Sequence, residues 1–457
     1  MRTARGHSAA ANPFPRQTES QWSDVRAPLV VPALLFVGAI LVARHLQGPA
    51  PIATTEVAGV IVQGIVAGDV TAERWGDAFE LLAISGARYL VSTHEHVTIG
   101  EHLRLRGTVT PFDEPRNPGE PSQADFARER GLYARLAEVA IISRAPPDAW
   151  DLRTLPARLR AAANANLHRY LAEPDATILA GMLYGARGAL PPELRAEFQD
   201  TGTVHVLVTA GLHLGVVAAL IAFVFSRIGI ARVPASLAAI PPIWAYAIVS
   251  GAHLPSLRAA TMVTVALAAR ALGERPISLN TLALAAIVVA ALWPASVGGA
   301  SFGLSFSCVA AIALFADGIT KALERWHVPA VMREALALTL STQIGVWPLT
   351  ASTFLVIAPY AALANLFVVP VVGVALTLGL VLLALSPIPP AAHIVANIVA
   401  WPLAWIESAV HLTAQLPFAH VVATPPPTWS LACYDAMMVA AAALLRANRE
   451  NAGKWAA

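Results

Sequence analysis

The stretch GTVHVLVTAGLHLGVVAAL, residues 202–220, is long and apolar, yet it contains two histidines, His205 and His213. The rest of the chain has a similar character: hydrophobic residues make up 56% of its 457 residues and charged residues only 13%. This composition is typical of integral membrane proteins. The formal net charge of +2 is too small to indicate a class of partner.

The N-terminal part contains a polar segment followed by an apolar one. Residues 1–26 include four arginines, and residues 27–43 are almost entirely apolar. Arg44, His45 and Gln47 come next, where a cleaved signal peptide would have small residues. We therefore expect a cytoplasmic segment at 1–26 and a retained transmembrane anchor at 27–43.

Residues 44–170 contain nearly half of the charged residues of the chain, together with turn residues and short alternating runs. The alternation predicts strands at 78–84, 87–92, 102–112 and 133–143. A small OB-like β-barrel fits these strands, and a sandwich fits them equally well on periodicity alone. Residues 152–172 are typical of an amphipathic, arginine-bearing helix that lies on the membrane or leads into it.

Residues 176–445 predict a helical membrane domain, and 446–457 predict a cytoplasmic tail. The apolar stretches indicate membrane spans at 203–226, 233–250, 256–272, 277–294, 298–316, 334–356, 361–385, 391–415 and 429–445. With the anchor at 27–43, the fold class is a polytopic α-helical membrane protein of about ten spans with a small extracytoplasmic β domain.

The positions of lysine and arginine support this topology. With a cytoplasmic N-terminus, the cytoplasmic loops contain Arg227, Arg232, Arg270, Arg275, Lys321, Arg325, Arg333, Arg446, Arg449 and Lys454. The opposite loops, at 251–255, 295–297, 357–360 and 416–428, contain no lysine or arginine. This alternation follows the positive-inside rule and places 44–170 outside the cytoplasm. The turn at 386–390, SPIPP, contains no charge and gives no indication.

Ionisable residues inside the predicted spans are candidates for function, because inserting one into lipid costs about 2.5 kcal/mol or more. His205, Thr209 and His213 are spaced four apart, so a continuous helix would place them on one face, close to Gly211 and Gly215. They fit either hydrogen bonds to neighbouring helices or the lining of a permeation path. A metal site would need further ligands that the sequence does not locate.

Five other polar positions within the spans each allow two interpretations. Arg258 either extends towards the outer face or provides a fixed positive charge at a pore mouth. Glu407 and His411 either satisfy each other or form a proton relay. Gln343 and Asn365 are either interhelical hydrogen-bond partners or contacts to a substrate.

Motifs of catalysis and cofactor binding are scarce. The chain contains no P-loop, GxSxG, HExxH or paired CxxC motif, and THEH at 93–96 fits a solvated loop better than a metal cluster. We therefore expect no enzyme activity, no cofactor and no metal.

Residues 202–217 resemble the signature of the ComEC family of bacterial competence proteins, close to G-L-S-H-L-L-A-I-S-G-L-H-V-G-L-V. The matching residues are Gly202, His205, Gly211, Leu212, His213 and Gly215, whereas Thr203 and Ala210 differ from the usual leucine and serine. Further blocks follow in the family's order: RNPGEPSQADFARERGLYA (116–134), LPSLRAATM (254–262), SFGLSFSCVAAI (301–312) with Ser305, QIGVWPLTASTF (343–354), then Asn365 and Pro370. Within them, Pro121 and Ser122 replace a usual Phe-Asp, and Gly303 replaces a glutamine.

The resemblance implies an inner-membrane channel, multi-pass with a cytoplasmic N-terminus, for uptake of single-stranded DNA during natural transformation. It implies partners: single-stranded DNA, membrane lipid, and the DNA receptor, motor and nuclease of the competence system, with a homo-oligomer as a possible assembly. The metallo-β-lactamase-like domain of many relatives is not expected, since only ANRENAGKWAA follows the last predicted span. A small-molecule or ion transporter and a non-transporting scaffold or remnant remain the alternatives.

Under this interpretation the candidate residues form three groups. The candidates for the DNA path or for helix packing are His205, Thr209, Gly211, His213, Arg258, Ser305, Gln343 and Asn365. The candidates for extracytoplasmic DNA binding are Arg88, Arg104, Arg106, Arg116, Arg128 and Arg130, because arginines bind phosphates. The candidates for a proton relay are Glu407 and His411.

Overall fold

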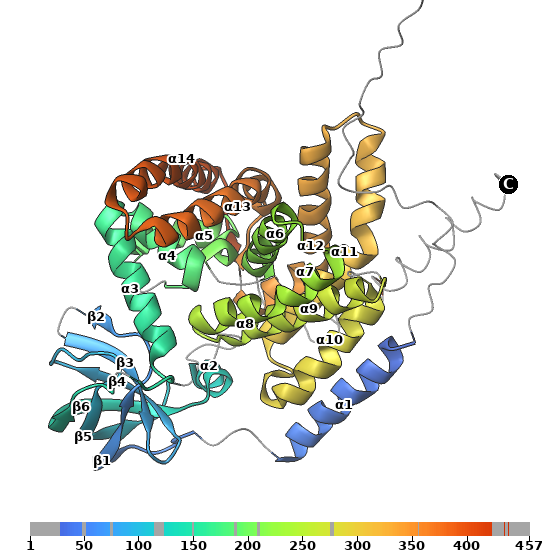
Figure 1. The fold of residues 1–457 in the computed structure, drawn as a ribbon. Helices are drawn as coiled ribbons and strands as arrows, with labels where there is room; N and C mark the ends of the chain where they lie inside the picture. Colours follow the sequence, from blue (N-terminus) through green and yellow to red (C-terminus); the bar gives the residue numbers. More distant parts are fainter. Residues whose placement is uncertain are drawn as a thin grey trace, which may run out of the picture.

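A small β domain and a bundle of helices make up the computed structural model of the chain (Figure 1). The structure describes residues 28–47, 52–73, 76–113, 123–148, 150–186, 190–207, 211–274, 278–354, 356–422, 434 and 437. The predicted tenth span at 429–445 and the predicted tail at 446–457 therefore lie almost entirely outside the described residues.

The β domain is a closed ring of five strands with one short additional strand. Its strands are β1 (Val57–Val66), β2 (Thr71–Glu73), β3 (Gly76–Ala83), β4 (Arg88–Thr93), β5 (His102–Thr110) and β6 (Leu132–Ala145). The order is β1-β5-β6-β4-β3-β2, and an added β1–β3 pairing closes the ring. All pairs are antiparallel except β4 with β6, which run parallel.

The alternation of the sequence explains how the barrel is filled. In β3 every second residue is buried, which places Phe79 and Leu81 in the core beside Val91 and Leu105. The four predicted strands are therefore confirmed with shifts of a few residues at their ends. The sequence interpretation did not include β1, a more continuously apolar strand that closes the ring.

The helices follow the barrel in chain order, apart from α1 and α2. They are α1 (Val30–Gln47), α2 (Gln123–Arg130), α3 (Leu155–Tyr170), α4 (Asp175–Tyr184), α5 (Pro192–Asp200), η2 (Val204–Leu207), α6 (Gly211–Arg227), α7 (Arg232–Ala238), α8 (Ile240–Val249), α9 (Leu254–Ala271), α10 (Leu279–Leu292), η3 (Pro294–Ser296), α11 (Ala300–Glu324), α12 (Ala330–Phe354), α13 (Ala361–Leu385) and α14 (Pro389–Ala414). Two short strands, β7 (Val356–Ile357) and β8 (Val421–Val422), pair beyond the two free ends of the α13–α14 hairpin.

Three of the described helices, α11, α13 and α14, are long and apolar enough to cross a membrane. Other predicted spans are shorter in the structure: α6 begins only at Gly211, and the segment predicted at 233–250 is divided into α7 and α8. Prolines at the start of α8 favour this division, because proline has no amide hydrogen to continue a helix. A total of ten spans stays a prediction.

The main core of the helical part lies between α4 and the α13–α14 hairpin. Nine of the ten residues of α4 are buried, and they pack with Val368, Val372 and Leu376 of α13 and with Leu403 of α14. The segment 176–202, for which the sequence interpretation gave no element, thus contains a central helix of the bundle.

Candidate functional site

The two histidines of the signature stretch lie in different helices. His205 belongs to the 3-10 helix η2, is exposed, and donates from Nδ1 to the carbonyl of Gly202 at 3.0 Å. His213 belongs to α6, is buried, and donates from Nε2 to the carbonyl of Val206 at 3.1 Å. His213 thus ties α6 to η2, whereas His205 is accessible from outside the core.

This arrangement corrects the expectation of one continuous helix with His205, Thr209 and His213 on one face. The turn η2 ends at Leu207 and α6 begins at Gly211, while Thr209 lies outside the described residues. Gly202, whose φ is +69°, ends the preceding helix α5, as glycine commonly does at a helix C-terminus. His205 then lies in the tighter 3-10 geometry of η2, which does not continue the face of His213 on α6. The chain then starts again with a 3-10 turn, and Gly211 opens α6 on an exposed surface.

Gly202 also brings the signature stretch against the start of α13. A Cβ atom at Gly202 would lie 2.9 Å from the Cβ of Ala361, so only glycine allows this close approach. Asn365 is one helical turn further along the same face of α13, and it is buried. Its side-chain oxygen Oδ1 accepts no hydrogen bond in the described part of the chain.

Arg258 connects two helices of the bundle. It is buried on α9, and its Nη2 donates to the Ser301 carbonyl at 2.8 Å, to Ser305 Oγ at 3.2 Å and to Ser301 Oγ. The structure therefore brings together the predicted Arg258 and Ser305, and it gives Arg258 partners on α11 inside the bundle. Gln343, on α12, is half-buried.

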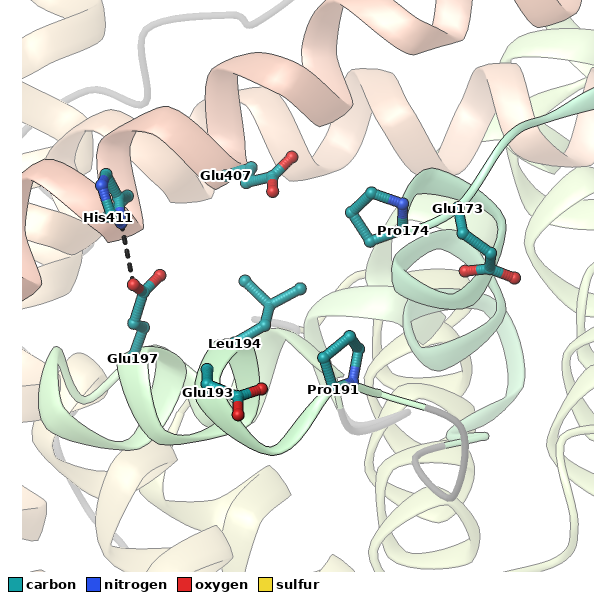
Figure 2. Close-up of a pocket in the computed structure, with 8 residues that line it drawn as sticks. All are labelled: Glu173, Pro174, Pro191, Glu193, Leu194, Glu197, Glu407 and His411. Carbon is teal, nitrogen blue, oxygen red and sulfur yellow. Dashed lines mark hydrogen bonds and ion pairs between the residues drawn. The ribbon is translucent and has the colours of Figure 1, made fainter.

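Glu407 and His411 line a pocket of about 400 Å³ between α5, α14 and the turn before α4 (Figure 2). The hydrogen bond of His411 Nδ1 goes to Glu197 Oε1 at 2.8 Å, on α5, instead of to Glu407. Glu173 and Glu193 also line this pocket. Burial raises the pKa of the nearby Asp175 carboxyl, and Glu407 and Glu173 add to this shift through charge repulsion.

Four carboxyl groups around one pocket give it a negative potential. Such a surface repels phosphate groups, so this pocket is unsuited to contact a nucleic-acid backbone. The sequence interpretation missed Glu197, because the polar segment PELRAEFQD was assigned no element and therefore no partner.

The predicted barrel arginines are distributed over several surfaces. Arg104 and Arg106 are exposed on β5, Arg88 is exposed at the start of β4, and Arg128 is half-buried on α2. Arg116 lies outside the described residues, as does the side chain of Arg130. The structure therefore places Arg104 and Arg106 on one face of one strand, with the neighbouring residues Leu103 and Leu105 in the core.

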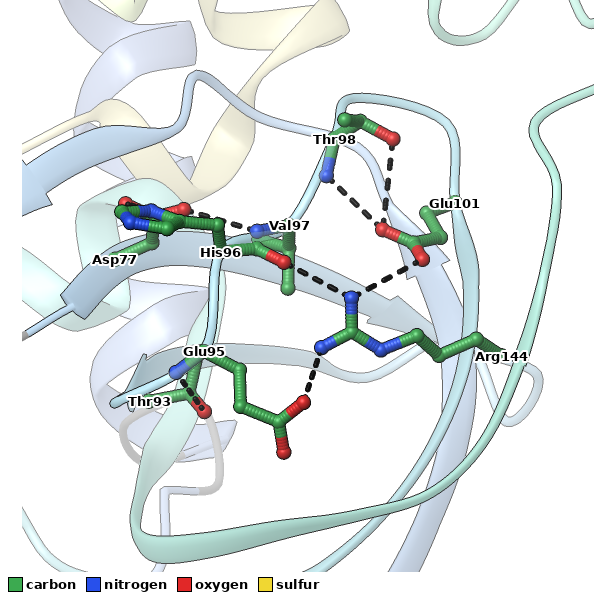
Figure 3. A network of polar contacts seen from close by, with 8 residues as sticks. All are labelled: Asp77, Thr93, Glu95, His96, Val97, Thr98, Glu101 and Arg144. Atoms are coloured by element: carbon green, nitrogen blue, oxygen red, sulfur yellow. Dashed lines mark hydrogen bonds and ion pairs between the residues drawn. The ribbon is translucent and has the colours of Figure 1, made fainter.

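The THEH stretch is a structured turn (Figure 3). Asp77 accepts from His96 Nδ1 at 3.2 Å and from the Val97 amide at 2.9 Å. Arg144 pairs with Glu95 and donates to the His96 carbonyl at 2.9 Å. In the part of the chain that the structure describes, no group of three or more histidine, cysteine, aspartate or glutamate residues could hold a metal ion.

A residue that the sequence interpretation did not single out joins the barrel to the bundle. Arg160 of α3 is buried, and its Nε donates to both carboxylate oxygens of Asp69, at 2.8 and 3.0 Å, in the loop after β1. Its Nη1 donates to the carbonyl of Val249, the last residue of α8, at 2.7 Å. A cation is favourable there because helix C-termini have a partial negative charge.

Comparison with known proteins agrees with the motif resemblance. A family model described as "Competence protein" matches residues 182–447. The ComE operon protein 3 of Bacillus subtilis (strain 168) is 25% identical over 236 residues, which cover 51% of this chain and 30% of that protein. The matched region is thus less than a third of the relative's length. No solved structure matches the chain.

Proposed function

This chain belongs to the competence protein family, and we propose that its helical bundle passes single-stranded DNA through the cell membrane during competence. Its role in DNA uptake is suggested by the family and by the relative from Bacillus subtilis. Passage through the bundle is supported by His205. This residue is exposed in η2, just before the start of α6, and it follows Gly202, which packs against α13.

We propose that the barrel is OB-like and contacts the incoming strand first. The ring order and the parallel pairing of β4 with β6 support an OB-type topology. OB barrels commonly bind single strands through a positively charged surface. Arg104 and Arg106, exposed side by side on β5, provide such charges outside the barrel core.

We propose that the DNA strand passes from the barrel to the bundle along the junction that Arg160 makes between them. This residue holds α3 against the outer end of α8, so that the barrel has a fixed position relative to the helices. Asn365 is buried one turn from the contact between α13 and Gly202, so it lies inside the bundle and not on the surface of the proposed path.

We propose a cytoplasmic N-terminus, with α1 running outwards. Two contacts support this direction: the Leu29 amide donates to Asn280 at the start of α10, and Arg44 donates to the Val297 carbonyl beyond its end. Thus α1 and α10 run parallel. The arginines at 270 and 275 precede α10, so its start is on the cytoplasmic side by the positive-inside rule.

The test is uptake of labelled DNA by a deletion strain complemented with the wild-type chain, His205→Ala or His213→Ala. We expect the deletion to abolish nuclease-resistant label while surface-bound label persists. His205→Ala should lower uptake at unchanged thermal stability, because His205 is exposed and its hydrogen bond among the described residues is a local one to the Gly202 carbonyl. His213→Ala should lower stability by about 1–3 kcal/mol, since it leaves the buried Val206 carbonyl without its donor.

Two results would contradict the proposal. Normal transformation of the deletion strain would remove the uptake role altogether. If His205→Ala has wild-type uptake, the strand does not depend on the entrance beside η2.

A further inference from the structure

The α13–α14 hairpin is held at its turn by the helix that leaves the barrel. The hydroxyl of Tyr170, the last residue of α3, donates to the Ser386 carbonyl at 2.8 Å. The ring of Tyr170 also packs edge-on against His393 of α14, with centroids 5.0 Å apart. The 386–390 turn and the end of α3 are therefore at the same depth relative to the membrane.

The length of α3 limits how far this turn can be from the barrel. Arg160 of α3 is in contact with the barrel through Asp69, and Tyr170 is ten residues further along, a rise of about 15 Å. The hydrocarbon core of a bilayer is about 30 Å thick. With the barrel in water outside the membrane, the turn cannot reach the cytoplasmic surface.

The free ends of the hairpin are also on the outer side. His411 bonds to Glu197 at 2.8 Å, and His420 pairs with Asp200 at 3.3 Å, so the end of α14 lies against α5. The chain runs from α5 through η2 into α6, which ends at Arg227 on the cytoplasmic side by the positive-inside rule. The start of α6, some 25 Å of helix away, is consequently at the outer surface.

The surface of α14 is divided lengthwise in a way that suits a helix lying in a membrane surface. One stripe is buried against the bundle: Ala392, Ala396, Val399, Leu403, Ile406, Val410 and Thr413. A second stripe is exposed and apolar: Ile394, Ile398, Trp401, Trp405 and Leu412. A third stripe is exposed and mostly polar, and it includes His393, Asn397, Ser408 and His411.

A membrane-crossing orientation would put these side chains in unfavourable places. Trp401, which is 81% exposed, is at the midpoint of α14 and would lie at the centre of the bilayer, whereas tryptophan prefers the interface. The exposed Asn397 and Ser408 of the polar stripe would face lipid. An in-plane helix instead puts the apolar stripe into the lipid and the polar stripe into water.

We propose that α13 and α14 form a hairpin that lies along the outer surface of the membrane, with the exposed Ile394–Leu412 stripe of α14 in the lipid interface. Both helices are long enough to cross, but their contacts place the turn and the free ends on one side. The uncharged SPIPP turn agrees with this placement, because cytoplasmic turns of this chain contain arginine or lysine. This inference does not depend on DNA passage.

The test is labelling of single cysteines by a membrane-impermeant maleimide in intact spheroplasts, in the full chain with Cys308 and Cys433 changed to serine. Ile388→Cys reports on the turn, and its side chain is exposed. Ile84→Cys on the barrel is the outer control, and Trp326→Cys between α11 and α12 is the cytoplasmic control; both side chains are also exposed. We expect Ile388→Cys to be labelled as fully as Ile84→Cys, and Trp326→Cys only after permeabilisation.

Labelling of Ile388→Cys only after permeabilisation would overturn the proposal, and so would failure to label under both conditions, since the turn would then be embedded. A nitroxide attached at Trp401→Cys gives a second readout of depth. We expect it near the headgroups, about 15 Å from the bilayer centre. A label at the bilayer centre would show that α14 crosses, and a label inaccessible to both lipid and water would show that a second copy covers the stripe; either result contradicts the proposal.

Discussion

Arg160 and Arg258 are both buried arginines, and each joins two parts of the fold that are distant in sequence. Arg160 holds Asp69 and the end of α8, while Arg258 holds two serines of α11. The sequence predicted that Arg258 is special, because a charge inside a membrane span is costly. The sequence does not single out Arg160, because its partner Asp69 is 91 residues away in a loop and only the fold brings the two together.

Removing the carboxylate of Asp69 should loosen the barrel from the bundle. Among the described residues, Asp69→Ala leaves the buried Arg160 guanidinium with the Val249 carbonyl as its partner, and we expect this loss to cost about 1–3 kcal/mol. The measurement is thermal unfolding in detergent, together with the rate of proteolysis between barrel and bundle. Arg153→Ala, at an exposed position of the neighbouring loop, is the control. Equal stability of both variants would show that the Arg160 junction does not hold the two parts.

At the scale of helices and strands, alternation predicted four strands of the barrel and amphipathic periodicity predicted α3. The 3-10 turn η2 was not predicted, because the apolar run 202–220 is the same whether or not it begins as an α-helix. The packing of Gly202 against α13 is a tertiary contact, which the run itself does not indicate. For the same reason the sequence left Glu407 and His411 either to satisfy each other or to form a proton relay, whereas His411 bonds to Glu197 of α5.

Gly202→Ala tests that contact, and Gly229→Ala is its matched control. Both glycines have a positive φ, +69° and +76°, so alanine costs each about 1 kcal/mol of backbone strain. A methyl group at Gly202 would also meet Ala361, whereas none would meet a neighbour at Gly229. Thermal unfolding should show that Gly202→Ala lowers the free energy of unfolding by about 1 kcal/mol more than Gly229→Ala does. An equal loss of stability in the two variants would show that α13 can move away from Gly202 at no cost.

At the scale of the whole molecule, composition and charge alternation indicated a membrane protein with an outer β domain. The number of spans could not be obtained in this way, because the α13–α14 hairpin is apolar and its turn is uncharged. Only its contacts with α3 and α5 distinguish a hairpin along the surface from two crossings. On the proposed topology, Arg104 and Arg106 of the barrel and the acidic pocket beside α14 face the same side of the membrane.

The division of charge over this surface predicts where DNA binds. Arg104→Ala and Arg106→Ala should each weaken single-stranded DNA binding by the full chain and reduce the slope of log K against log salt by about 0.7. Arg195→Ala, on α5 near the acidic pocket, should leave that slope unchanged. Fluorescence anisotropy at several salt concentrations measures all three. A larger change for Arg195→Ala than for the β5 variants would contradict binding at the barrel.

We propose that the strand enters the bundle beside η2. A photoreactive phenylalanine in place of His205, illuminated in cells during uptake of labelled DNA, measures whether the strand contacts this position. Trp401, on the exposed apolar stripe of α14, receives the same replacement as the control. We predict a covalent DNA adduct at position 205 and none at position 401. Adducts of equal yield at the two positions, or at neither while uptake continues, would contradict a path beside η2.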